Sequence, residues 1–442
     1  MMSDTAVRYR TILMLGLPII GGMLSQSLLN LVDAALVGQL GAKALAATGA
    51  GSYGNFVAIS LVLGLSSAVQ SMVARRRGQR HYATMLQPVE GGLLLSLLIA
   101  LPLSLLFIHY SSNLLAPLTQ PGTADIAQQY FDYRTSAMVA VAMNLAFRGW
   151  WNGTERPGYY LLSLIATHLL NVAVSYGLIF GVFGLPAMGA PGAGLGTAIA
   201  LFAGAAINGL MLWQDSRRQQ IPLFTLKPAM LRTLLTLALP PSVQQLLMAL
   251  AVISLFYIVG MLGLEEQAIA HVLINLALFL ILPAVGFGVA AMSLVSRALG
   301  EKQTVLAQNW GWAVAKTALI TLCLISLPMW LLPDQVLGMF FSDPALITLA
   351  HTPLQLTALA ICVDAVAIVL GQALLGAGEN RLVLTISTVM QWGLFLPLAW
   401  LSGPVMGYGL LGIWFCQVLY RGLSSLIYIR IWQRQQWQAC VL

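Results

Sequence analysis

Residues 15–49 read LGLPIIGGMLSQSLLNLVDAALVGQLGAKALAATG, and they open a stretch, 15–78, that recurs without a gap 222 positions later as 237–300. The positions that set bends, tight turns and charge recur in register, namely Pro18 with Pro240, Gly38 with Gly260, Gly41 with Gly263, Gly64 with Gly286, Arg75 with Arg297 and Gly78 with Gly300. Because the offset is almost half of 442 residues, the chain is interpreted as two copies of one unit.

The composition predicts an all-α membrane protein. Hydrophobic residues make up 59% and charged residues 8%, and the mean hydropathy is +0.85. A helix needs ~20 mostly apolar residues to cross a bilayer. Twelve windows meet this requirement, at 11–40, 44–73, 86–109, 126–151, 159–183, 190–213, 230–262, 266–296, 306–331, 346–376, 382–402 and 408–432. We therefore expect twelve transmembrane helices in two six-helix lobes.

The basic residues support this topology, because all but two of those in the loops and at the ends fall on one side of a twelve-helix arrangement. The two exceptions are Lys43 and Arg134, on the side that carries most of the loop carboxylates. The positive-inside rule then predicts a multi-pass protein of the cytoplasmic (inner) membrane with both termini in the cytoplasm. The net charge of +7 is explained by short loops that face anionic lipid, so we expect no nucleic-acid partner.

The lobes are predicted at 1–213 and 231–442, joined by a cytoplasmic linker at 214–230. An even number of helices per lobe makes the repeat parallel, related by an axis along the membrane normal. Such repeats are typical of transporters that alternate access between two halves. Pro18 is a candidate conformational hinge, since a proline inside a helix can hold a bend.

Asp33 is the first candidate functional residue. A carboxylate within a spanning helix costs ~2.5–3.5 kcal/mol on insertion scales, so it should face a cavity or a partner. Gln26, Asn30 and Asp33 follow spacings of four and three, which places them on one helical face. Removal from water disfavours the charged carboxylate. We therefore expect Asp33 to exchange a proton near physiological pH.

The segment 159–183 is the expected partner of this polar face. Thr167, Asn171 and Ser175 recur every four residues, with His168 beside them. Thr167 is interpreted as a residue that forms a hydrogen bond between helices. Asn171 and Ser175 are candidates for the site around Asp33, and His168 is a candidate proton relay or simply a buried hydrogen-bonding group.

Two further polar residues are assigned to a substrate cavity together with Gln26 and Asn30, namely Asn144 and Asp364. Asp364 has no acidic counterpart in the first repeat, so the lobes are chemically asymmetric. It is interpreted either as cavity lining or as a second cation site. Glu90 lies near a helix end, where its head can reach water, and is interpreted as structural.

The sequence resembles the multidrug and toxic compound extrusion (MATE) family over its whole length, and most closely the DinF-like branch. The resemblance rests on residues 15–49, LVSRALGEK at 294–302, FRGWWNGTERP at 147–157 and LGQALLGAGEN at 370–380. It implies that Asp33 and Asn171 form the pocket for the coupling cation. Where the branch often has a second polar or acidic residue one turn later, this chain has Ser175, which leaves one carboxylate for a proton.

These observations predict a proton/drug antiporter that extrudes amphipathic, mainly cationic compounds, coupled through Asp33. One alternative is sodium coupling, with Asp33, Asn171, Ser175 and Thr197 as oxygen ligands. The other is a flippase for lipid-linked precursors. We expect no enzyme, no cofactor and no resident metal, and we expect a monomer that is driven by a proton gradient. The substrate itself is not encoded in a motif.

Overall fold

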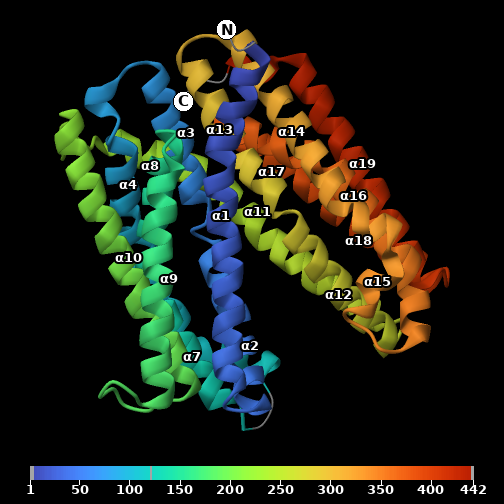
Figure 1. Cartoon of the computed structure of the whole chain (residues 1–442). Helices are drawn as coiled ribbons and strands as arrows, with labels where there is room; N and C mark the ends of the chain where they lie inside the picture. The colour runs from blue at the N-terminus through green and yellow to red at the C-terminus, as the bar shows by residue number, and fades with distance from the viewer. Residues whose placement is uncertain (1–3, 120–121, 440–442) are drawn as a thin grey trace. The chain divides into compact units, whose positions relative to one another are not determined.

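The computed structural model describes residues 4–119 and 122–439, and all regular structure within these ranges is helical (Figure 1). The long helices and their segments are α1 (Asp4–Gly38), α2 (Ala42–Ser60), α3 (Gly64–Gly78), α4 (Gln87–Leu95), α5 (Leu101–His109), α7 (Ala124–Ser136), α8 (Met138–Gly153), α9 (Pro157–Phe180), α10 (Ala190–Gln219), α11 (Pro228–Gly260), α12 (Leu264–Leu280), α13 (Leu282–Gly300), α14 (Thr304–Leu331), α16 (Pro344–Ala377), α17 (Asn380–Thr388), α18 (Leu396–Trp400) and α19 (Gly409–Arg434). Short helices are α6 (Ser111–Leu115) and α15 (Pro333–Gly338), and π-helical turns lie at Ser96–Ala100, Val389–Phe395 and Leu401–Val405.

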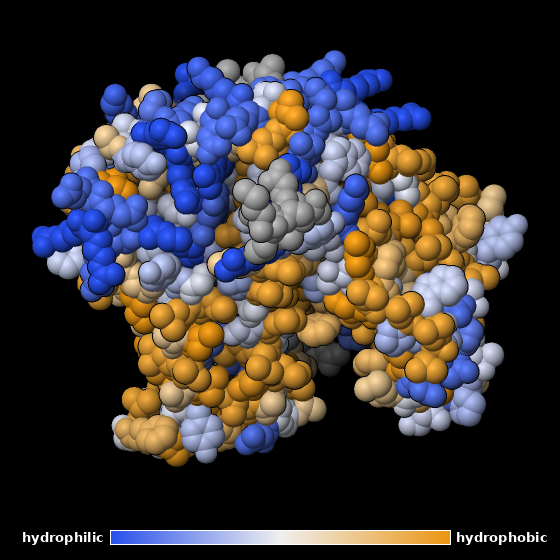
Figure 2. Space-filling view, turned by 45° about the horizontal axis from the view of Figure 1, so that its top comes forward, coloured by the Kyte–Doolittle hydropathy of each residue, from blue (hydrophilic) through white to orange (hydrophobic). Residues whose placement is uncertain are grey.

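The predicted all-α membrane class is confirmed. Within the described residues, eleven segments are long and apolar enough to cross a membrane. The remaining predicted window, 126–151, is helical but divided into α7 and α8 at Ala137. Figure 2 shows hydrophilic residues gathered over the upper part of the view and hydrophobic residues over most of the surface below them, as expected of a protein whose helices cross a bilayer.

The helices pack as two units. The N-unit is residues Gly21–Val243, and the C-unit is the chain up to Ile20 together with the residues from Gln244 onward. The borders fall inside α1 and α11, just after Pro18 and the Pro240–Pro241 pair. The lobes were predicted at 1–213 and 231–442. The packed units differ from these lobes, because the first half of α1 packs with the second repeat and the first half of α11 packs with the first repeat.

The recurring glycines explain how these half-helices are held. In the N-unit, a Cβ on Gly64 would lie 2.0 Å from Ala238 O, and the Gly64 amide donates to Ser242 Oγ at 3.0 Å. In the C-unit, a Cβ on Gly286 would lie 2.5 Å from Ile20 Cγ1. Ser242 and Ile20 are themselves 222 positions apart. A close helix approach at the same repeat position is therefore found in each unit, against backbone at Gly64 and against a side chain at Gly286.

A hydrogen bond from a tryptophan indole also recurs between equivalent pairs of helices in the two units. In the N-unit, Trp151 Nε1 on α8 donates to Asn208 Oδ1 on α10 at 3.2 Å, a sequence separation of 57. In the C-unit, Trp414 Nε1 on α19 donates to Thr357 Oγ1 on α16 at 2.7 Å, again with a separation of 57. A constant sequence separation between contacting residues is expected when two neighbouring helices run parallel.

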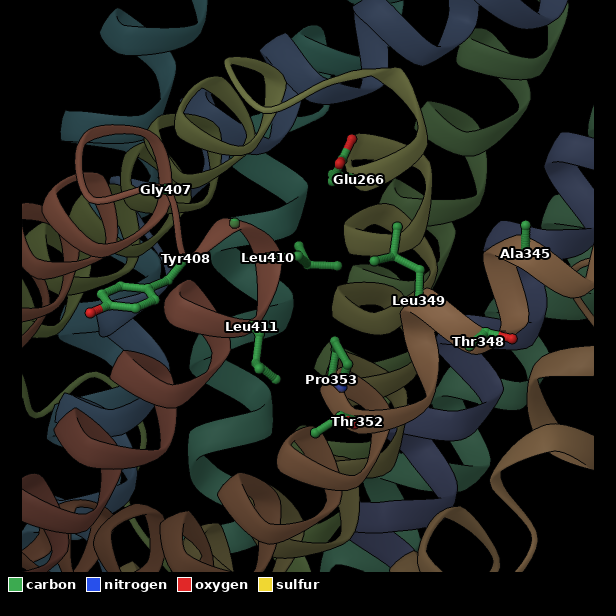
Figure 3. Close-up of a pocket in the computed structure, with 11 residues that line it drawn as sticks. Glu266, Ala345, Thr348, Leu349, Thr352, Pro353, Gly407, Tyr408, Leu410 and Leu411 are labelled. Carbon is green, nitrogen blue, oxygen red and sulfur yellow. The ribbon is translucent and has the colours of Figure 1, made fainter.

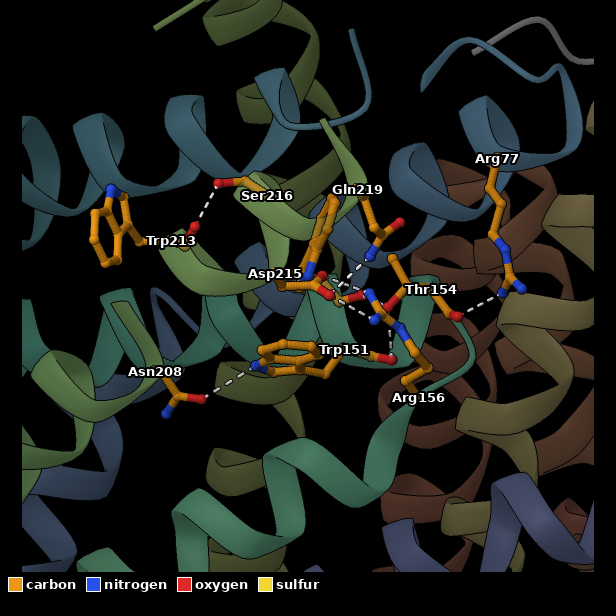
Figure 4. A network of polar contacts seen from close by, with 10 residues as sticks. Arg77, Trp151, Thr154, Arg156, Asn208, Trp213, Asp215, Ser216 and Gln219 are labelled. Atoms are coloured by element: carbon orange, nitrogen blue, oxygen red, sulfur yellow. Dashed lines mark hydrogen bonds and ion pairs between the residues drawn. The ribbon is translucent and has the colours of Figure 1, made fainter. Parts of the chain in front are cut away.

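One end of the N-unit is fastened by an ion-pair network (Figure 4). Arg156, at the start of α9, donates to both oxygens of Asp215 on α10 at 2.7 and 2.6 Å. Gln219 donates to the same carboxylate at 2.8 Å. Arg77, on α3, donates to Thr154 O at 2.5 Å. A bidentate arginine–carboxylate pair is a geometrically specific link, and this one fixes the α8–α9 turn against the end of α10.

Hydrogen bonds join the segment between α10 and α11 to α4, and they explain the role of Glu90. The Glu90 carboxylate accepts from the amides of Phe224 and Thr225 at 2.5 and 3.0 Å, while Gln87 donates to Thr225 O at 2.7 Å. The structure therefore gives Glu90 a structural role, as predicted, but the role is to anchor the inter-repeat linker.

We expect Gly64→Ala to destabilise the protein by about 1–3 kcal/mol, because the new methyl group would overlap the backbone of α11. Thermal unfolding of purified protein measures the change. Gly49→Ala is the matched control, since a Cβ there meets nothing within 4 Å and alanine favours a helix. Equal effects of both substitutions would contradict the close approach at Gly64.

Candidate functional site

Most of the predicted site residues gather in the N-unit, on the second half of α1 and on α9 and α10. Two glycines on α10 let it approach α9 closely. A Cβ on Gly196 would lie 2.4 Å from Ser175 Oγ, and one on Gly204 would lie 2.5 Å from Thr167 Oγ1. The polar side chains of α9 are thereby pressed against the backbone of α10.

A buried chain of hydrogen bonds results. Ser175 Oγ donates to Asn171 Oδ1 at 2.8 Å, and Asn171 Nδ2 donates to Thr197 Oγ1 at 3.3 Å. Thr197 Oγ1 in turn donates to Ala193 O at 2.9 Å. All three side chains are less than 7% exposed. Asn171, Ser175 and Thr197 are thus brought together, and their polar atoms bond mainly to one another.

His168 connects α9 to the polar face of α1. Its Nε2 lies 3.2 Å from Gln26 Oε1, and its Nδ1 lies 2.8 Å from Ser25 Oγ. Since an amide oxygen only accepts, Nε2 carries the proton and donates, and the Ser25 hydroxyl donates to Nδ1 when the ring is neutral. Gln26 Nε2 donates onward to Asn30 Oδ1 at 3.2 Å. The predicted stripe on α1 therefore faces α9.

Asp33 stands one turn beyond this chain and has no hydrogen bond to it among the described residues. Its Oδ1 is buried without a hydrogen-bond partner. The opposite charge that acts on it is the guanidinium of Arg134 on α7, although the two side chains form no direct ion pair. Arg134 is held elsewhere, donating to Tyr130 Oη at 2.8 Å. An unpartnered carboxylate oxygen is open to a proton or a cationic ligand.

Arg134 is the site residue that the sequence analysis missed. Its signal was present, because it and Lys43 are the two basic residues on the side of the chain that carries most of the loop carboxylates. In this structure Arg134 donates to Tyr130 Oη at 2.8 Å, and it also interacts with the charge of Asp33.

The other predicted residues lie apart from this cluster. Asn144 on α8 donates to Ala140 O and Leu201 O, each at 2.9 Å, and accepts from Asn208, so it joins α8 to α10. Asp364 lies in the C-unit, paired with Arg421. Pro18 lies inside α1, which continues through it as one helix.

One open pocket in the C-unit holds none of the predicted site residues (Figure 3). It has a volume of about 690 Å³ and is lined by α12, α16 and the start of α19, with Glu266, Thr348 and Tyr408 as its main polar side chains. Among the described residues, no group of three or more His, Cys, Asp or Glu side chains is placed to hold a metal ion.

Comparisons with known proteins agree on one family. The profile of the family described as MatE matches residues 18–177 and 240–401, one segment in each repeat. The probable multidrug resistance protein NorM of Bradyrhizobium diazoefficiens is 27% identical over 413 residues, covering 91% of this chain and 88% of the relative. The multidrug resistance protein NorM of Burkholderia vietnamiensis is 26% identical over 432 residues, covering 95% and 92%.

Solved structures show the same fold. An outward-facing multidrug resistance MATE family transporter of the MOP superfamily superposes with a TM-score of 0.87 at 21% identity, covering 97% of this chain and 95% of the other. A MOP superfamily transporter from Pyrococcus furiosus gives a TM-score of 0.89 at 20% identity, covering 98% and 97%. The Vibrio cholerae MATE transporter VcmN in its bent form gives 0.88 at 20% identity, covering 98% and 97%.

We expect a measurable energetic coupling between Asp33 and Arg134. Arg134→Leu leaves a charged carboxylate in a helix interior without its counter-charge, so it should lower stability, and adding Asp33→Asn should restore part of the loss. A double-mutant cycle on thermal unfolding should give at least about 0.5 kcal/mol of coupling. Lys43→Leu, which removes the other basic residue of that side, is the control and should show no coupling to Asp33→Asn.

Proposed function

Since the chain belongs to the MATE family of membrane transporters, we propose that it is a secondary multidrug exporter that exchanges protons for amphipathic, mainly cationic compounds. The family membership rests on the profile match to both repeats. The NorM relatives, which are named as multidrug resistance proteins, support the substrate class. Small molecules of this kind, protons and the lipid bilayer are the proposed partners, and no cofactor is required.

The observation that carries proton coupling is the state of Asp33. Its buried Oδ1 has no hydrogen-bond partner, while each of its polar neighbours on α1 and α9 already bonds to another side chain. A carboxylate oxygen without a hydrogen-bond partner can gain or lose a proton without breaking the hydrogen bonds among its neighbours. We infer that Asp33 is the residue that takes up and releases the proton.

Exchange follows from competition at this carboxylate. When Asp33 is charged it attracts a cationic compound, and when it is protonated that attraction is lost. Proton and drug then oppose each other's binding by the same free energy, since linkage is reciprocal. Pro18 and the two glycines that follow it, Gly21 and Gly22, are the proposed hinge in α1, because proline removes one helical hydrogen bond and glycine weakens the helix.

Sodium coupling remains the second candidate, and one observation favours it. Asn171, Ser175 and Thr197 place three buried oxygen atoms in one cluster, and sodium binds hard oxygen ligands of this kind. Against it, those oxygens already accept or donate within the cluster, and no hydrogen bond connects Asp33 to it in the described part of the chain. Proton coupling needs no rearrangement of the cluster.

The test is substrate-induced proton efflux from everted membrane vesicles in sodium-free buffer, after a pH gradient has been established. We expect a cationic dye to dissipate the gradient with the native protein, and Asp33→Asn, inserted at an equal level, to reduce the rate at least about tenfold, as loss of an obligatory group would. Glu265→Gln is the control, because this exposed carboxylate lies at the start of α12 in the C-unit and is not one of the site residues.

The outcomes separate the candidates. Dye movement that appears only when sodium is restored would replace the proton mechanism with a sodium site. No dye movement with either cation would contradict drug export and favour a flippase for lipid-linked precursors.

We further propose that the protein lies in the cytoplasmic membrane with both termini inside, because the arginines of α3, α10 and α19 cluster at helix ends. A reporter that fluoresces only in the cytoplasm should be bright when fused to the C-terminus, and alkaline phosphatase fused there should be inactive. Active phosphatase would reverse the topology.

A further inference from the structure

Two thiols meet between neighbouring helices of the C-unit. Helices α14 and α16 pack against each other (Figure 1). Cys323 on α14 and Cys362 on α16 are both free cysteines, and their side chains lie within hydrogen-bonding range of each other. Their positions in the sequence show no metal-ligand or disulfide spacing, so the packing of the two helices is what brings the sulfur atoms together.

A buried serine holds the Cys362 thiol against α14. Ser326 Oγ lies 3.1 Å from Cys362 Sγ and donates to Cys323 O at 3.1 Å. Because a carbonyl oxygen only accepts, the single hydroxyl proton is used there, and the Cys362 thiol donates to Ser326 Oγ. Ser326 is therefore a positioning residue that keeps the sulfur of α16 on the side of α14 where Cys323 lies.

A third cysteine in the same unit shows how a solitary buried thiol is accommodated. Cys416, on α19, is buried, and its Sγ has Leu398 O and Ser402 Oγ as hydrogen-bond partners, neither of which is sulfur. This is the ordinary behaviour of cysteine as a small, mostly apolar residue. Cys323 and Cys362 differ from it in two ways, because they are only half-buried and because each has a second thiol beside it.

The thiol pair lies next to an apolar face of α14 that the C-unit leaves exposed. Ile320, Leu324 and Leu327 surround Cys323 on this helix, and all three side chains are exposed within the described residues. Residues three and four apart lie on one face of a helix, so Cys323 borders the exposed face. Since α14 is long and apolar enough to cross a membrane, the reagent that best reaches Cys323 is an uncharged, apolar one dissolved in the bilayer.

We propose that Cys323 and Cys362 are a redox-sensitive pair that closes into a disulfide, and thereby fastens α14 to α16, when an apolar hydroperoxide enters the bilayer. A disulfide needs its sulfurs about 2 Å apart, and thiols already within hydrogen-bonding range approach this distance by side-chain rotation. The inference concerns a modification of the chain and goes beyond the proposed transport, because it requires neither a substrate nor a coupling ion.

The chemistry takes two balanced steps. One thiol reacts with the hydroperoxide, whose O–O bond breaks, and the products are a sulfenic acid and an alcohol. The sulfur of the second thiol then attacks the sulfenic sulfur, so that the S–S bond forms, the S–O bond breaks and water leaves. In total the two thiols lose two electrons and two protons, and the hydroperoxide is reduced to alcohol and water. Exchange with an external dithiol reverses the reaction.

Oxidation of the full-length protein in lipid nanodiscs with cumene hydroperoxide tests the proposal. After the remaining free thiols are blocked, peptide mapping by mass spectrometry identifies which cysteines are linked. We expect a Cys323–Cys362 link within one chain that disappears in Cys323→Ser and in Cys362→Ser. Cys416→Ser is the matched control and should leave the link unchanged. Ser326→Ala keeps both thiols and should slow formation of the link about fivefold, as expected when one positioning hydrogen bond is lost.

Thermal unfolding supplies a second readout. The oxidised native protein should unfold about 5 °C higher than the reduced protein, because a cross-link constrains the unfolded chain. Dithiothreitol should abolish this shift, and Cys323→Ser should show none. Separate oxidation of Cys323 and Cys362 without a link would overturn the proposal, and so would two thiols that stay reduced or that link to other chains. Failure of the dye-driven proton efflux would contradict the proposed export and leave this result untouched.

Discussion

Close helix packing at Gly64 and Gly286 is the constraint on which the architecture depends. At these two equivalent positions any side chain would overlap the half-helix that each unit receives from the other repeat, namely the start of α11 or the start of α1. Where lipid and protein interior are equally apolar, small residues and close approach supply the association of helices. The glycines therefore recur in the sequence because both units pack a half-helix closely at the same repeat position.

The same absence of water makes partnered and unpartnered polar groups easy to tell apart. Most polar side chains of α1, α9 and α10 form short chains of hydrogen bonds, such as Ser175 to Asn171 to Thr197. Asp33 Oδ1 on α1 does not, and it is one of several buried polar atoms without a hydrogen-bond partner in the described residues. In a low-dielectric interior an unsatisfied group is expensive, so a proton or ligand that binds Asp33 relieves this cost.

Hydrophobic windows and charge sidedness predicted the helices well, because length and apolar content follow directly from bilayer thickness. They did not predict the break at Ala137, because a hydropathy window averages over the polar α7 and the apolar α8 and does not record a change in the helical backbone. The periodicity predicted that Gln26 and Asn30 lie on one face of α1 and that α9, with His168, is the partner of this face, and the structure brings these side chains together. The assignment to the DinF-like branch stays a prediction. Neither Arg134 near Asp33 nor Arg421 on Asp364 was predicted, because periodicity describes one helix and not its neighbour.

The chemical asymmetry of the repeats follows from this difference. Gene duplication supplies two identical scaffolds, and contacts that hold the scaffold must stay the same in both, as the paired glycines and the recurring separation of 57 do. Positions that do not make these packing contacts can differ in residue type between the two repeats. Asp33 aligns with Leu255 within the gap-free repeat. This charged position thus has an apolar counterpart in the other repeat, which shows that the fold does not need the charge there. A charged group that the fold does not need can serve a ligand instead, and Asp33 is such a group in the N-unit.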